Sequence, residues 1–325
     1  MTITHYYPFN SDDLSVLKGQ LKKDSPIGKI CWLGVGGKSD WLYQPSGLDD
    51  LRQFLQLLDE DSPLIVIGAG SNLIVRDGGV RGVVIRLGKP FSNIQIEDCR
   101  IRTGGFTKDA LVATKAAEKG IDLTFLRTIP GTLGGAVRMN AGCYGSYLAD
   151  HFVEATVVMR DGSLKVIEKD ACNFGYRHCD LPPDAIIVEV VLEAPKDSVE
   201  ALQTKLKKFL ERRSESQPTG TKTAGSAFRN PAGYSSTWED NDNHELKAWK
   251  LIDEVGLRGA KYGDAQVSTK HPNFLVNTNK ASAYQIEKLG EIVRRKVFDK
   301  KNIVLEWEII RLGEFDGQIV EEFTR

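Results

Sequence analysis

The chain has 325 residues, 41% hydrophobic and 27% charged, which is a globular balance with enough apolar material for more than one core. Its 43 basic and 44 acidic residues leave a net charge of −1, and no basic stripe of the kind that binds nucleic acid is visible. We expect a cytoplasmic protein with reduced thiols, because there is no signal peptide, no membrane span and no CxxC pair among the five cysteines.

The first 195 residues predict a mixture of short strands and a few helices. A loosely held helix is expected within residues 1–28, and a helix capped by Ser46 follows a strand at 41–45. A second helix is expected from Thr107 to Glu118. Further strands are predicted at 64–67, 73–75, 83–87 and 186–192, with hairpins at 94–102 and 156–167. This mixture is typical of the α+β class.

The last third of the chain predicts a separate α/β domain. A lysine-rich helix is expected at 202–213, followed by a loop at 218–222. Strands are then predicted at 225–229, 274–277 and 303–312, and helices at 248–255 and 283–297. We therefore divide the chain into an N-terminal extension (1–28), a domain at 29–195 with lobes of about 29–90 and 91–195, and a C-terminal domain at 198–325.

A first glycine-rich loop, I-G-A-G-S-N-L-I-V, spans Ile67 to Val75. It is not a Rossmann loop, because Leu73 occupies the place of the third glycine and a strand follows instead of a helix. No G-K-[ST] follows, so it is not a P-loop either. Backbone N–H groups in such a loop can hold a diphosphate, with Ser71 and Asn72 as further donors. The alternative is a tight connection that needs glycine for a positive φ.

A second glycine-rich stretch runs from Ile129 to Gly145 and contains five glycines. Gly131, Gly134 and Gly135 allow a flat or anionic group to approach the backbone, and Asn140 can bond the carbonyls of a heterocycle. The alternative is a crossover in which glycine serves close packing. Two such loops in one domain favour a single large cofactor that contains a diphosphate.

Together, G-A-G-S-N-L-I-V-R-D-G-G-V-R-G and I-P-G-T-L-G-G-A-V-R-M-N-A-G resemble the FAD-binding region of the UDP-N-acetylenolpyruvoylglucosamine reductase (MurB) family. This family belongs to the flavoproteins with a vanillyl-alcohol-oxidase-like (PCMH-type) FAD domain, and the resemblance runs from about Gly36 to Gly313. It implies a two-lobed FAD-binding domain, a C-terminal substrate domain and non-covalent FAD. The cofactor-binding residues that it implies are Gly68, Ala69, Gly70, Ser71, Asn72, Leu73, Gly131, Thr132, Gly134, Gly135, Asn140, Ala141, Gly142 and Arg213.

Three polar motifs match the same family in order: F-G-Y-R-H (174–178), A-G-S-A-F-R-N-P (224–231) and L-E-W-E-I-I-R-L-G (305–313). Without the resemblance, the residues of these motifs would be interpreted as ordinary strand, turn or surface residues. Strand alternation places Glu306, Glu308 and Ile310 on one face of the strand predicted at 303–312. The resemblance implies that Arg177, Ser226 and Glu308 are catalytic, with Ser226 as proton donor. Arg177 suits a carboxylate, and we expect Glu308 to be protonated or bridged by Arg177.

The implied reaction is the NADPH-dependent reduction of UDP-N-acetylglucosamine enolpyruvate to UDP-N-acetylmuramate in peptidoglycan precursor synthesis. The short interval between Arg177 and Ser226 resembles the subtype that lacks a tyrosine-bearing loop over the substrate. We expect a monomer with no metal site, because the five histidines lack ligand spacing. The substrate-binding residues that the resemblance implies are Tyr176, Gln217, Arg229, Asn230, Lys261 and His271, with Lys270 as a further neighbour of the diphosphate or uracil.

Two other functions stay open on the sequence. The first is a flavin-dependent oxidase or dehydrogenase of the same FAD-domain group. Such enzymes often attach flavin to a His or Cys, and neither glycine loop contains a histidine. The second is a non-enzymatic UDP-sugar binder, which predicts loss of the catalytic trio, whereas all three residues are present.

Overall fold

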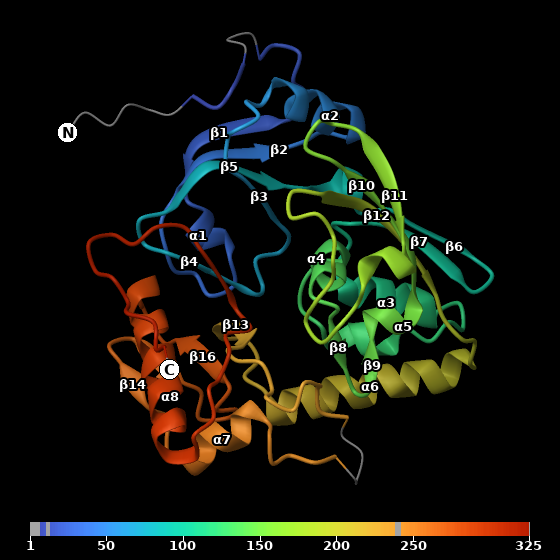
Figure 1. Cartoon of the computed structure of the whole chain (residues 1–325). Coiled ribbons are helices and arrows are strands. Elements are labelled where there is room, and N and C mark those ends of the chain that lie inside the picture. The colour runs from blue at the N-terminus through green and yellow to red at the C-terminus, as the bar shows by residue number, and fades with distance from the viewer. Residues whose placement is uncertain (1–6, 11–13, 238–241, 325) are drawn as a thin grey trace.

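A computed structural model gives the structure of residues 7–10, 14–237 and 242–324. Three larger sheets and two short strand pairs are arranged around the middle of the molecule, with helices packed against them (Figure 1). Most of the strand pairs are antiparallel, which makes this the α+β class that the sequence predicts.

The first sheet has the strand order β1-β2-β5-β3. β1 pairs antiparallel with β2, whereas β5 lies parallel to both β2 and β3. The elements of this lobe are β1 (Gln20–Ser25), α1 (Ile27–Ile30), β2 (Ser39–Gln44), α2 (Leu48–Leu57), β3 (Leu64–Ile67), β4 (Leu73–Val75) and β5 (Val80–Arg86). α2 buries Leu51, Phe54 and Leu55 against this sheet, as the helical spacing predicts.

The second sheet is antiparallel throughout, with the order β11-β10-β12-β7-β6. Its strands are β6 (Ile94–Glu97), β7 (Arg100–Gly104), β10 (Phe152–Val158), β11 (Leu164–Glu168) and β12 (Ile186–Glu193). The other elements of this lobe are η1 (Lys89–Phe91), α3 (Asp109–Ala117), η2 (Thr124–Thr128), α4 (Leu133–Arg138), β8 (Gly142–Cys143), β9 (Ser146–Tyr147), α5 (Leu148–His151), η3 (Lys169–Cys172) and, leading out of it, α6 (Val199–Ser216).

The third sheet, β13-β16-β15-β14, belongs to the C-terminal part of the chain. Its elements are β13 (Lys222–Ser226), α7 (Ala248–Glu254), β14 (Lys261–Tyr262), β15 (Ala265–Val267), β16 (Phe274–Asn277) and α8 (Ala283–Lys301). β17 (Ile310–Leu312) leaves this region and pairs in parallel with β4. The C-terminal hydrophobic core also contains Leu33, Val35 and Ile74. The first lobe and the C-terminal part of the chain therefore share one hydrophobic cluster.

Several predicted boundaries are wrong. Residues 20–25 form a strand where a helix was expected. α2 has Gly47 at its N-cap position instead of Ser46, and α3 has Lys108 there instead of Thr107. The lysine-rich helix is longer than predicted, and the strand expected at 225–229 is β13, which ends at Ser226.

The strand predicted at 303–312 exists only at its end, in β17. Before it, the chain makes an isolated bridge between Trp307 and Phe228. As a result Glu306, whose side chain is 72% exposed, and Glu308, at 11%, do not share the environment that strand alternation predicted.

Candidate active site

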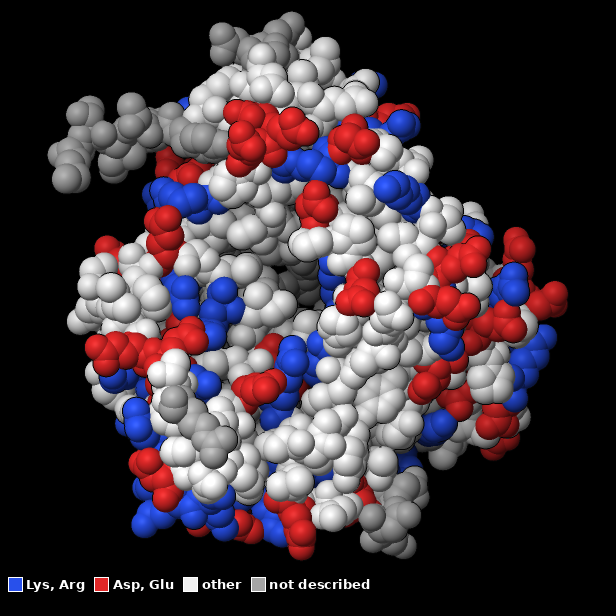
Figure 2. Space-filling view, viewed as in Figure 1, with Lys and Arg blue, Asp and Glu red and all other residues white. Residues whose placement is uncertain are grey.

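A cavity of about 520 Å³ lies between the two sheets of the N-terminal part and the C-terminal part of the chain. The space-filling view shows the molecule hollowed near its centre (Figure 2). Both glycine-rich loops line the cavity, as do all three predicted catalytic residues, Arg177, Ser226 and Glu308. Its volume lies within the range of sites that bury a small-molecule ligand.

The first loop connects β3 to β4 and lines the cavity from Gly68 to Leu73. Within the described chain, the backbone N–H groups of residues 69–71 donate no hydrogen bond, so they remain available as a nest for an anion. The Asn72 amide donates to the carbonyl of Glu308 at 3.1 Å, and the N–H of Ile310 donates to the Asn72 carbonyl at 3.1 Å. The first loop therefore holds the segment that carries Glu308.

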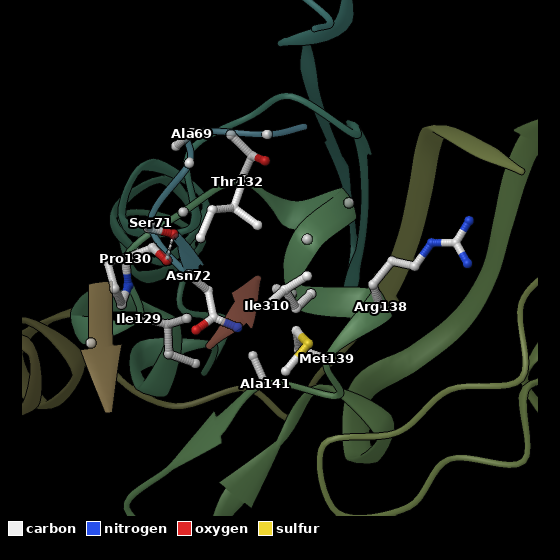
Figure 3. Close-up of a pocket in the computed structure, with 18 of the residues that line it drawn as sticks. Ala69, Ser71, Asn72, Ile129, Pro130, Thr132, Arg138, Met139, Ala141 and Ile310 are labelled. Carbon is white, nitrogen blue, oxygen red and sulfur yellow. Dashed lines mark hydrogen bonds between the residues drawn. The ribbon is translucent and has the colours of Figure 1, made fainter. Parts of the chain in front are cut away.

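The second loop contains a helix that the sequence did not predict, α4, within the glycine-rich stretch. The two loops are joined by a hydrogen bond from Ser71 Oγ in the first to the Pro130 carbonyl in the second, at 2.8 Å (Figure 3). Gly135 lines the cavity, and a Cβ added to it would have no heavy atom of the described residues within 4 Å. This glycine therefore leaves open space in which a flat ligand can approach the backbone.

Arg177 and Glu308 form an ion pair at the cavity, with 2.7 Å between Arg177 Nε and Glu308 Oε1. Burial lowers the pKa of Arg177, but Glu308 and Tyr176 outweigh it and raise this pKa above its ordinary value. The bridging of Glu308 by Arg177 that we expected is thus present. Among the described residues, Arg177 Nη1 is buried with no hydrogen-bond partner, which leaves one donor unused by the protein.

Arg177 is held in a left-handed conformation (φ 56°) within a tight turn between Gly175 and His178. The Asn140 amide donates to the Gly175 carbonyl at 2.9 Å, so Asn140 fixes this turn. Asn140 itself does not line the cavity. On the opposite side, Arg177 Nη2 donates to Ser235 Oγ at 3.3 Å.

Ser226 is the last residue of β13 and lines the cavity next to Gly225. Gly225 has a φ of 80°, and a Cβ there would have no heavy atom of the described residues within 4 Å, so the space beside Gly225 is open. In the part of the chain that is described, no residue forms a hydrogen bond with the Ser226 hydroxyl. The hydroxyl is therefore available to a ligand.

Arg213 and Gln217 reach the cavity from the end of α6. The guanidinium of Arg213 donates to the Thr128 carbonyl, and burial lowers its pKa. Arg213 thereby ties the C-terminal end of α6 to the end of η2, directly before the second glycine loop.

The remaining predicted substrate residues lie outside the cavity lining. The backbone N–H of Asn230 donates to Tyr176 Oη at 3.3 Å, and the ring of Tyr176 lies against the guanidinium of Arg177. Arg229 pairs loosely with Glu306, at 3.8 Å. Lys261 is exposed on β14, and Lys270 bonds the backbone of α6.

His271 is partly buried, and among the described residues its ring nitrogen Nδ1 is buried with no hydrogen-bond partner. Burial and the nearby Arg258 lower the pKa of His271 to about 4. The imidazole is therefore neutral near pH 7 and can offer a ligand a hydrogen bond rather than a positive charge.

Sequence reasoning missed several groups that line the cavity. Cys143 lines it and donates to the Phe125 carbonyl at 3.1 Å, and burial raises its thiol pKa to about 11. Asp109, at the start of α3, also lines the cavity, and its position before an apolar helix gave no hint of this. Arg138, Met139 and Ile310 complete the part of the wall drawn in Figure 3.

The chain is similar to known proteins in both of its parts. Residues 40–168 match the family described as FAD binding domain, and residues 217–312 match UDP-N-acetylenolpyruvoylglucosamine reductase, C-terminal domain. A protein of Ruegeria pomeroyi named UDP-N-acetylenolpyruvoylglucosamine reductase is 52% identical over 306 residues, which cover 94% of this chain and 99% of the relative. Its namesake from Dinoroseobacter shibae is 54% identical over 298 residues, covering 92% and 97%. The crystal structure of the Thermus caldophilus reductase of that name matches with a TM-score of 0.75 at 32% identity, over 91% of this chain and 100% of the other.

Proposed function

Because the chain belongs to the UDP-N-acetylenolpyruvoylglucosamine reductase family, we propose that the central cavity is its active site and that Arg177, Ser226 and Glu308 act there. The enzyme is an FAD-dependent oxidoreductase that uses NADPH to reduce UDP-N-acetylglucosamine enolpyruvate to UDP-N-acetylmuramate for peptidoglycan synthesis. The predicted fold, a vanillyl-alcohol-oxidase-like FAD-binding domain followed by a C-terminal substrate domain, is confirmed. The observation that supports the proposed site is that all three residues line the same cavity as both glycine loops.

The cavity lining fits FAD. Unused N–H groups at residues 69–71 suit its diphosphate, and the open space beside Gly135 suits a flat ring. The residues that would hold the cofactor are those of the two loops, 68–73 and 131–142, with Arg213 from α6. The chemistry that bound FAD supplies is transfer of hydride from NADPH to the terminal carbon of the enolpyruvyl ether.

Arg177 is proposed to hold the carboxylate of the substrate. After hydride addition, negative charge develops on the neighbouring carbon and spreads into this carboxylate, so a fixed cation there stabilises the transition state. The free Nη1 of Arg177 supplies a donor, while Glu308 and Ser235 fix the other two nitrogens. A guanidinium oriented in advance loses less entropy when the carboxylate binds.

Ser226 is proposed to give its hydroxyl proton to the enolate carbon. A hydroxyl is a weak acid, but an enolate is a strong enough base to accept its proton when the two are held in contact. The position of Ser226 at the end of β13, open to the cavity, supports this role. Glu308 positions Arg177 in this scheme.

The sugar nucleotide is proposed to extend from the cavity past Arg177 to Tyr176, which lies against Arg177, and to Asn230, which is hydrogen-bonded to Tyr176. Gln217, Arg229, Lys261, Lys270 and His271 are then the further candidates for contacts with the sugar, diphosphate or uracil. Burial, chiefly, raises the pKa of Tyr176 to about 12, so its hydroxyl stays neutral and can donate a hydrogen bond.

We infer a cytoplasmic monomer that binds no nucleic acid, with domain boundaries near residues 28 and 195–198. In the described residues, no helix is long and apolar enough to span a bilayer, and no three His, Cys, Asp or Glu side chains are grouped as metal ligands would be. Gel filtration with light scattering tests the oligomeric state.

NADPH oxidation by the purified FAD protein tests the function as a whole. We expect oxidation to depend on UDP-N-acetylglucosamine enolpyruvate, with UDP-N-acetylmuramate as the product. If the rate of NADPH oxidation did not depend on this substrate, the reductase assignment would be rejected. The alternative function, an oxidase of the same flavoprotein group, would then be favoured.

A further inference from the structure

Asp109 is a buried carboxyl group on the cavity wall that the proposed mechanism does not use. It is the first residue of α3, is only 1% exposed and lines the cavity. Its backbone N–H donates to the Gly131 carbonyl at 3.4 Å. A Cβ on Gly131 would lie 3.3 Å from Asp109 Oδ2 and 3.1 Å from Ser71 Oγ. The carboxyl group therefore sits where the two glycine loops meet.

Neither carboxyl oxygen of Asp109 has a hydrogen-bond partner among the described residues. Buried polar side chains almost always have one, because a buried group without a partner keeps the full cost of its desolvation. The nearby Ser71 hydroxyl already donates to the Pro130 carbonyl. A ligand in the cavity is therefore the natural source of the missing partner.

The surroundings of Asp109 favour its neutral form. Burial raises its pKa well above the ordinary value for an aspartate, and no charged group offsets this effect. The two loop segments that face it, 67–72 and 129–132, carry no charged side chain, and Lys108 next to it is exposed. The cations that line the same cavity are Arg138, Arg177 and Arg213. The N-terminal end of α3 favours a negative charge, which opposes the effect of burial.

We propose that Asp109 binds the diphosphate of FAD as a neutral carboxylic acid that donates its O–H to a phosphate oxygen. This proposal rests on FAD occupying the cavity as proposed above. An ionised carboxylate would repel a diphosphate held by the N–H groups of the two loops, whereas a neutral one adds a donor to them. A hydrogen bond to an oxyanion is stronger than one between neutral groups.

The dissociation constant of FAD, measured by flavin fluorescence on protein stripped of cofactor, tests the contact. Asp109→Asn keeps the size of the side chain and an N–H donor, so its affinity should stay within about threefold of wild type. Asp109→Ala removes the donor and should weaken FAD binding by about tenfold or more. Asp49→Ala is the matched control, because Asp49 is an exposed acid in the first turn of α2 and should not affect FAD binding.

Two further measurements identify the phosphate contact and the protonation state. ADP carries the diphosphate without the flavin, and Asp109→Ala should weaken its competition with FAD by a similar factor. Infrared difference spectra of the wild-type and Asp109→Asn holoproteins should show the carbonyl band of a protonated carboxylic acid in the wild type alone.

Each part of the proposal is overturned by a different result. Wild-type FAD affinity in Asp109→Ala overturns the contact with FAD, and undiminished competition by ADP overturns the diphosphate assignment. Absence of the carbonyl band overturns the neutral donor. If the wild-type protein itself takes up no FAD, the proposed function fails and this inference fails with it, a result distinct from failure in the variants alone.

Discussion

The Nε of Arg177 donates a hydrogen bond to Oε1 of Glu308 at 2.7 Å, although 131 positions separate the two residues in the chain. Their side chains are only 14% and 11% exposed. Arg177 lies in a turn of the second lobe, whereas Glu308 lies just before β17 in the C-terminal part. The ion pair therefore joins the two parts of the chain at the cavity. We expect its loss to reduce the rate of catalysis more than the affinity for FAD.

Glu308→Gln should slow reoxidation of reduced FAD by the enolpyruvyl substrate by roughly 10²-fold. The variant keeps a hydrogen-bond acceptor but removes the charge that orients the guanidinium of Arg177, and small losses of alignment have effects of this size. Stopped-flow measurement of the two half-reactions should show unchanged reduction by NADPH. Glu306→Gln is the control, because Glu306 is 72% exposed. Wild-type rates in both half-reactions of Glu308→Gln would limit the pair to a structural role.

Ser226→Ala should leave reduction of bound FAD by NADPH intact and slow its reoxidation by roughly 10²–10⁴-fold, the usual contribution of a positioned acid. The reason is that the enolate then has no adjacent proton donor. Ser214→Ala, on the exposed side of α6 with its hydroxyl bonded to the Glu211 carbonyl, is the control. Reoxidation at the wild-type rate in Ser226→Ala would assign the proton to another group.

The family resemblance grouped the two glycine loops with Arg177, Ser226 and Glu308, because each lies in a short contiguous motif, and all of them line one cavity. The placement of Glu308 could not be predicted, since it depends on Asn72, 236 positions away, whose amide holds the Glu308 carbonyl. Strand alternation assumes a neighbouring strand, but residues before Ile310 make only the isolated bridge of Trp307 with Phe228. A pattern within one segment carries no information about such partners.

The missed strand β1 has a different cause. Its residues Gln20–Ser25 are mostly exposed, so the segment lacks the alternation of apolar and polar side chains that identifies a strand. What holds it is backbone pairing with β2. Asp109 was missed for a related reason, because burial of a carboxyl group depends on loops 40 residues before it and 20 residues after it.

Gly135→Ala should weaken FAD binding while stabilising the protein stripped of FAD. Alanine in a helix is favoured over glycine by about 0.5–1 kcal/mol, and the added methyl group meets no protein atom within 4 Å. The same methyl group would occupy the space proposed for FAD. Thermal unfolding of the stripped protein and FAD titration measure the two effects separately. Unchanged FAD affinity would mean that the cofactor does not approach Gly135.

Gly290→Ala provides the opposite result in α8, which contributes no residue to the cavity lining. A Cβ at Gly290, in α8, would overlap the ring of Trp307. Overpacking of this kind typically costs about 1–3 kcal/mol. We expect a lower free energy of unfolding with FAD affinity unchanged in the folded protein, and a gain in stability would contradict the close packing of α8 on Trp307.

His271 should make stability depend on pH between about 4 and 6.5. The unfolded chain protonates this histidine near its ordinary pKa of 6.5, whereas burial and Arg258 hold the folded pKa near 4. Between these values the unfolded state binds more protons, so stability falls as the pH drops and is fully present above 6.5. This group alone should cost roughly 2 kcal/mol between pH 7 and 5.

Urea unfolding at pH 7 and pH 5 measures this contribution. His271→Gln cannot take up the proton, so its free energy of unfolding should fall by less than that of the wild type over this interval. His244→Gln, at a side chain that is 44% exposed, should retain the wild-type dependence on pH. Equal losses in wild type and His271→Gln would mean that folded His271 is protonated as readily as in the unfolded chain, and that it can carry a positive charge beside a bound nucleotide.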